Sequence, residues 1–100
     1  MKVNFGAGIE TLDGEAMLMA PDRPWTIGRM AADCLLARDP RDASTAMSVA
    51  QVSERYALAL RLVKGQVEEI TVAEADLIQR AVALHSAPIA AAQIIALTNA

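Results

Sequence analysis

The stretch that decides the fold runs from Ser48 to Gly65 and reads SVAQVSERYALALRLVKG. Its apolar residues recur every three or four positions, a spacing typical of an amphipathic α-helix. Ser48 with Gln51 forms a capping box, although Asp42 or Ser44 offers an alternative start, and Gly65 suits the left-handed position after the last turn. We expect the apolar face to pack on the core. That face comprises Val49, Val52, Tyr56, Ala59, Leu60 and Val63, widened by Leu58 and Leu62, with Gln51, Glu54, Arg55, Arg61 and Lys64 toward water.

Two further helices are expected on the C-terminal side of this stretch. After a short connector, Thr71 with Glu74 forms a second capping box, which predicts a helix from about Val72 to Leu84. A proline, tolerated in a first turn because its missing N–H costs nothing there, then opens a last helix from Ala87 to about Leu97. The predicted inner face of the earlier helix comprises Val72, Ala75, Ile78, Ala81, Val82 and His85.

A helix is also expected on the N-terminal side of the stretch. Thr26 has the hydroxyl side chain of a good N-cap. Asp39-Pro40 ends the helix, because the residue before proline avoids the α conformation. Its inner face follows the i, i+3, i+4, i+7, i+8 pattern and comprises Ile27, Met30, Ala31, Cys34 and Leu35.

The first twenty-five residues have a different character from the rest. Lys2–Phe5 has a sequence typical of a short strand. The segments Ile9–Leu12 and Glu15–Leu18 flank Asp13-Gly14, a pair that predicts a hairpin with a type I′ turn. We expect a loop at residues 20–24, because its two prolines cannot continue a ladder of hydrogen bonds.

These elements predict one fold class. We expect a mostly α protein with an N-terminal β-hairpin followed by a compact bundle of about four helices. Residues 1–100 form a single domain by length, with the hairpin and its loop in residues 1–25 and the bundle in residues 26–100.

Composition and charge narrow the class of function. Hydrophobic residues make up 54% of the chain, so a folded domain is expected rather than disorder. Nucleic-acid binding is not expected, because the nine basic residues are scattered, the net charge is −3 and three residues are aromatic. Cys34 is the only cysteine, which excludes an intramolecular disulfide and favours a reducing compartment. No signal peptide is evident, and we expect a cytoplasmic protein.

No constellation of residues predicts catalysis, a metal site or a cofactor. His85 is the only histidine, and no Cys, Asp or Glu stands at a productive spacing, so we interpret it as a residue near the C-terminal dipole of its helix. Cys34 lies on an apolar helix face, where cysteine behaves as a small hydrophobe. We therefore expect that the protein is not an enzyme. Two carboxylate pairs are interpreted as solvated surface: Asp39 with Asp42, and Glu68 with Glu69.

The last twenty residues, Ala81–Ala100, carry no charged side chain. Only the helix from Ala87 to Leu97 is apolar on all sides, and about eleven residues cannot span a bilayer. Such a helix is buried in its own domain or docks on another chain. Two interpretations of this helix are possible. It is either a central core helix only, or a core helix that also forms a surface for oligomerisation or for a partner. The candidate interaction residues are its largest side chains, Ile89, Ile94, Ile95 and Leu97.

Several short motifs together resemble a known class of proteins. In chain order they are Leu12-Asp13-Gly14, Trp25-Thr26-Ile27-Gly28, Arg55-Tyr56-Ala57-Leu58-Ala59, Ile70–Ile78, Ala87-Pro88-Ile89 and Gln93. This order resembles small hypothetical proteins encoded by tailed bacteriophages and prophages, although residues 38–46 and 90–92 diverge. The resemblance implies no enzymatic activity. It implies an accessory role in virion assembly, or binding to a host factor, in a bacterial cytoplasm.

We therefore expect a non-enzymatic, phage-type protein–protein interaction module that associates with itself or with a protein partner through its C-terminal helix. No cofactor and no membrane are expected among its partners. The alternative is a nucleic-acid-associated regulator, for which folding must gather basic side chains on the first two helices. Those side chains are Arg29, Arg38, Arg41, Arg55, Arg61 and Lys64.

Overall fold

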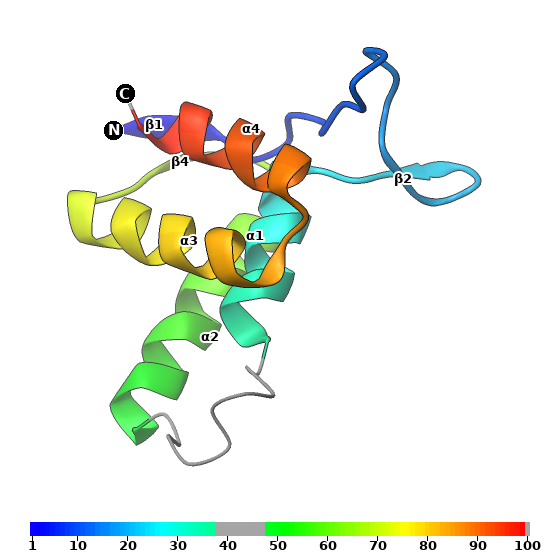
Figure 1. Cartoon of the computed structure of the whole chain (residues 1–100). Coiled ribbons are helices and arrows are strands. Elements are labelled where there is room, and N and C mark those ends of the chain that lie inside the picture. The colour runs from blue at the N-terminus through cyan, green and yellow to red at the C-terminus, as the bar shows by residue number, and fades with distance from the viewer. Residues whose placement is uncertain (38–47, 100) are drawn as a thin grey trace.

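The chain forms four helices and two small antiparallel sheets in the part that the structure describes. The computed structural model describes residues 1–37 and 48–99 (Figure 1). The predicted class is confirmed, since the fold is mostly α with an N-terminal hairpin. In chain order the elements are β1 (Lys2–Asn4), β2 (Leu18–Ala20), β3 (Arg23–Pro24), α1 (Ile27–Leu36), α2 (Val49–Val63), β4 (Val67–Glu69), α3 (Val72–His85) and α4 (Pro88–Thr98).

The helix boundaries follow the capping residues. Both predicted capping boxes are present, with the hydroxyl of Ser48 or Thr71 accepting from the backbone N–H three residues further on. Thr26 caps α1 in the same way. Gly65 follows α2 with φ +66°, a conformation that glycine adopts without steric cost. The predicted end of α1 at Asp39-Pro40 and the alternative caps Asp42 and Ser44 lie outside the described residues.

α1 and α2 lie antiparallel and approach most closely at Gly28. A Cβ atom added to Gly28 would overlap the backbone carbonyl of Leu62, so this glycine lets the two backbones come together. About two helical turns from this contact, the guanidinium of Arg55 donates to the carbonyl oxygen of Leu35 (3.4 Å). The start of α1 therefore faces the end of α2. Because α1 ends at Leu36, the first turn of α2 extends past it.

α3 packs against α1, and α4 packs mainly against α3 (Figure 1). The inner face predicted for α1 is buried, with Met30 half-buried at its edge. The inner face predicted for α3 is buried at Ala75, Ile78, Ala81 and Val82. Val72 is 84% exposed, because it is the first residue of the helix and lies at its outer end, and His85 at the other end is half-buried.

The connector predicted after α2 contains a strand. β4 pairs antiparallel with β1, placing Glu68 opposite Val3. The pairing continues past the strands, where the backbone N–H of Ile70 donates to the carbonyl oxygen of Met1 (2.8 Å). The sequence did not reveal β4 because three residues carry too little alternation. Its partner lies at the opposite end of the chain.

Residues 9–25 form an arm that projects from the helices (Figure 1). The predicted type I′ turn is wrong. The backbone N–H of Gly14 donates to the carbonyl of Thr11 (3.0 Å), and Gly14 is left-handed (φ +81°), but Asp13 is not. One glycine in the left-handed region costs less than a glycine and an aspartate together. The expected loop at residues 20–24 is also partly wrong, because Arg23–Pro24 pairs with β2 at an edge, where proline is tolerated.

The buried face of α2 is only part of the predicted one. Leu58, Ala59 and Leu62 are buried. Periodicity showed that α2 has an apolar side, but the side that meets α1 is set by the close contact at Gly28 and the hydrogen bond from Arg55. The predicted core residues that are instead exposed are Val49, Val52, Tyr56, Leu60 and Val63.

Candidate interaction surface

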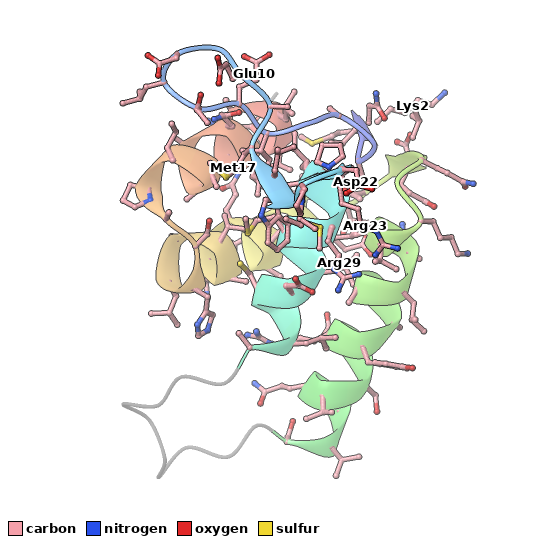
Figure 2. All side chains as sticks on the ribbon, turned by 90° about the vertical axis from the view of Figure 1, so that its right-hand side faces the viewer. Lys2, Glu10, Met17, Asp22, Arg23 and Arg29 are labelled. Carbon is pink, nitrogen blue, oxygen red and sulfur yellow. The ribbon has the colours of Figure 1, made fainter. Side chains whose placement is uncertain are left out.

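α2 presents an apolar stripe to solvent, which we call the outward face. It consists of Val49 (85% exposed), Val52 (48%), Tyr56 (54%), Leu60 (47%) and Val63 (41%). The neighbouring small residues Ala50, Ser53 and Ala57 are exposed as well. In Figure 2, α2 forms one border of the molecule, and many of its side chains extend away from the other helices. A contiguous exposed apolar stripe of this kind marks an interaction site more often than an isolated exposed leucine does.

The charged side chain nearest the end of α2 turns toward the rest of the protein. Arg61 donates to the carboxylate of Glu74 (2.6 Å) and to the carbonyl oxygen of Glu69 (2.8 Å). The carboxylate of Glu68 lies 3.8 Å from the same guanidinium. Burial acts to raise the pKa of Glu74, but hydrogen bonds from the Thr71 amide and from Arg61 outweigh it and hold that pKa below its ordinary value. Arg61 therefore ties the end of α2 to α3 and β4.

Two more charged side chains of α2 lie on the side of the neighbouring helices. Arg55 reaches the end of α1 through its bond to the Leu35 carbonyl. Arg55 and Glu54 also line a shallow groove between α2 and α3, together with Asp76 and Arg80, whose side chains pair with each other (3.0 Å). α2 thus differs from an ordinary surface helix in being apolar on two sides, because it buries Leu58, Ala59 and Leu62 and also presents an apolar stripe to water.

The four candidate residues on the C-terminal helix do not lie on one surface. Ile94 is fully buried, Ile89 and Ile95 are half-buried, and Leu97 is 44% exposed. An interaction through α4 stays a prediction, carried by the side chains that reach the surface. The buried side of α4 explains its lack of charge, because Ala90, Ala91 and Ile94 pack into the core.

Gln93 has a role that the sequence did not reveal. Its side-chain oxygen accepts from the backbone N–H of Glu10 (2.9 Å), and its amide nitrogen donates to the Glu10 carbonyl (2.7 Å). This pair of bonds fastens the base of the arm to α4 across 83 positions of the sequence. The feature of the sequence that could have indicated this role is a single glutamine among the apolar residues of the helix.

The arm carries a second set of exposed apolar side chains. Leu12 at its tip is 94% exposed, and Leu18 and Met19 on β2 are 52% and 37% exposed. The charged residues Asp22 and Arg23, which follow β2 in the arm, are exposed as well. The exposed apolar residues of the arm are therefore interspersed with charge, unlike the outward face of α2.

The residues whose side chains most often take part in catalysis or metal binding are Cys34, His85 and the acidic residues. Cys34 is buried on α1, and burial, helped by the charge of Asp33, raises the pKa of its thiol, so the nucleophilic thiolate is disfavoured. His85 is half-buried at the end of α3. Within residues 1–37 and 48–99, no three His, Cys, Asp or Glu side chains come close enough to hold a metal ion. Glu69 pairs with the N-terminal amine (2.9 Å), and the pair Asp39 with Asp42 lies outside the described residues.

The basic side chains of the alternative function are partly engaged with acidic or carbonyl groups. Arg29 pairs with Asp33 (3.3 Å), while Arg55 and Arg61 make the contacts described above. Arg38 and Arg41 lie outside the described residues, and Lys64 is exposed at the C-cap of α2. Within the described part, α1 and α2 therefore gather no set of unengaged guanidinium groups from these three arginines.

Comparisons of the chain with models of protein families, with curated proteins and with solved structures find no match. No described helix combines the length and the apolar composition needed to cross a membrane.

Proposed function

We propose that this protein is a non-enzymatic protein–protein interaction module of the phage type, an accessory protein of assembly, with the outward face of α2 as its contact surface. The observation that supports the proposal is the apolar stripe that α2 leaves exposed in addition to its buried face. Each apolar Å² left in water costs about 25 cal/mol, and a partner that covers the stripe recovers this free energy. α2 is favoured over α4 because α2 offers five large exposed side chains in one stripe, whereas α4 offers one exposed side chain, Leu97, and two half-buried isoleucines.

The proposal is tested by photo-crosslinking of the full chain in bacterial cells. The photoreactive residue p-benzoylphenylalanine replaces Tyr56, whose ring is half-exposed at the centre of the stripe. A discrete covalent adduct is expected after irradiation. The matched control places the same residue at Arg80, which is exposed on α3, where no such adduct is expected. Irradiation that yields no adduct at Tyr56, nor at Val52 or Leu60, contradicts the proposed function.

A further inference from the structure

The outward face of α2 is symmetrical about Tyr56. Val52 and Leu60 lie four residues before and after it, and Val49 and Val63 lie seven residues before and after it. We propose that the occupant of this face is a second copy of the chain, with the two α2 helices packed antiparallel across a two-fold axis at Tyr56. This inference rests on the proposed function, and it names the partner.

The symmetry is what a two-fold contact between identical helices requires. In an isologous contact, a residue at one distance from the axis meets the residue at the same distance on the other side. Val49 then meets Val63 of the second copy, Val52 meets Leu60, and the two Tyr56 rings lie next to each other. Spacings of three and four keep these side chains on one side of the helix, and the small residues beside them let two helices approach to about 8–10 Å. A partner of different sequence would place no such constraint on the stripe.

The charge distribution agrees with a second copy. Two identical chains carry like charge, so a contact between them is disfavoured wherever charged groups face each other. Along α2, Glu54, Arg55 and Arg61 lie on the sides toward α1 and α3, the exposed Lys64 lies at the C-cap beyond Val63, and the stripe itself is uncharged. Two outward faces therefore meet without facing charges, whereas a strongly charged partner finds no complementary group there.

The length of α2 limits the area of the contact. α2 has 15 residues and is about 22 Å long at 1.5 Å per residue. Two such faces bury on the order of 1,000 Å² in total, which is below the area of stable interfaces and within the range of weak, transient ones. We therefore expect a reversible dimer whose population depends on concentration.

Sedimentation velocity of the purified full chain from about 1 μM to 1 mM tests the dimer, a range that spans weak reversible affinities. The wild type shifts from monomer to dimer as concentration rises. Leu60→Asp, which buries an unpaired carboxylate of each copy against Val52 of the other, raises the dissociation constant at least about tenfold, a change of about 1.4 kcal/mol. Leu97→Asp is the matched control, since the same residue type is 44% exposed on α4 against 47% for Leu60 on α2. Equal or greater weakening by Leu97→Asp overturns the inference.

Cysteine pairs test the antiparallel arrangement. In a Cys34→Ala background, oxidation with diamide links Tyr56→Cys to itself, because that position lies on the axis. Val49→Cys does not link to itself but links to Val63→Cys when the two variants are mixed. Linkage of Val49→Cys to itself overturns the antiparallel arrangement. Circular dichroism verifies that each variant is folded.

The mass of the photo-crosslinked adduct separates this inference from the proposed function. An adduct of twice the chain mass supports the dimer. A purified protein that stays monomeric, together with an adduct of another mass at Tyr56, overturns the dimer and leaves the interaction module standing. A monomer without any adduct contradicts both.

Discussion

Gly28 fixes how α1 and α2 fit together. Its missing side chain leaves room for the carbonyl of Leu62, and this contact helps to set which side of α2 is buried. In the sequence, Gly28 has the appearance of an unfavourable residue inside a helix. The requirement for glycine arises from a backbone 34 positions away along the chain, which local pattern does not record.

Gly28→Ala is expected to lower the free energy of unfolding by about 2 kcal/mol, because the added methyl group forces the two helices apart. Urea denaturation monitored by circular dichroism measures this change. Gly8→Ala is the control, since its nearest new contact is the Trp25 carbonyl at an ordinary 3.8 Å, and its effect should stay within about 0.5 kcal/mol. Equal effects of the two substitutions would show that α1 does not touch α2 at Gly28.

Glu74 gives stability a defined pH dependence. Its pKa in the folded protein is lower than its ordinary value of 4.5, so its contribution is fully present above that value and is lost as pH falls through the lower folded pKa. Glu74→Gln should cost about 1 kcal/mol at pH 7, with a difference from wild type that shrinks in strongly acidic solution. Denaturation at several pH values measures it. Asp76→Asn, which removes an exposed pair with Arg80, should cost less than about 0.5 kcal/mol.

At the scale of the element, the sequence predicted where helices begin better than which side of them is buried. Capping is local, so Ser48 and Thr71 marked their helices correctly. The burial of a face is decided by the neighbour. α2 has enough apolar residues to offer two overlapping faces, and the one with the more regular spacing, around Tyr56, meets water.

Two leucines on α2, two positions apart, should therefore behave differently. Leu62→Ala is expected to cost about 2–5 kcal/mol of unfolding free energy, because it opens a cavity beside α1. Leu60→Ala should cost less than about 1 kcal/mol in dilute solution, where the protein is monomeric. Thermal denaturation at low protein concentration compares them. A larger loss for Leu60→Ala would contradict the exposure of Leu60 and the burial of Leu62.

At the scale of the whole molecule, the sequence predicted the class but not the long-range pairings. The mostly α fold with an N-terminal hairpin is confirmed. The β1–β4 sheet and the bond between Gln93 and Glu10 join segments that are distant along the chain, and neither leaves a periodic signal. The lack of charge on the C-terminal helix is explained by the core, in which Ile94 is fully buried.

Because α2 exposes an apolar side that the sequence predicted to be buried, the candidate interaction surface lies on α2 rather than on α4. The four residues proposed on the C-terminal helix were chosen because that helix lacks charge, which is a signal of burial as much as of binding. An interaction surface is better indicated by apolar residues whose own domain does not cover them, and this property depends on the assembled fold. The outward face of α2 could be named only after Leu62 and Arg61 had fixed the orientation of the helix.

A dilution series of ¹⁵N-labelled protein followed by two-dimensional NMR tests most directly whether two copies meet through the outward face of α2. The amide signals of residues 48–64 are expected to shift progressively with concentration, most strongly around Tyr56, while those of the exposed side of α3 near Arg80 stay fixed. Signals of α2 that do not move, or shifts confined to the arm or to α4, would contradict this account.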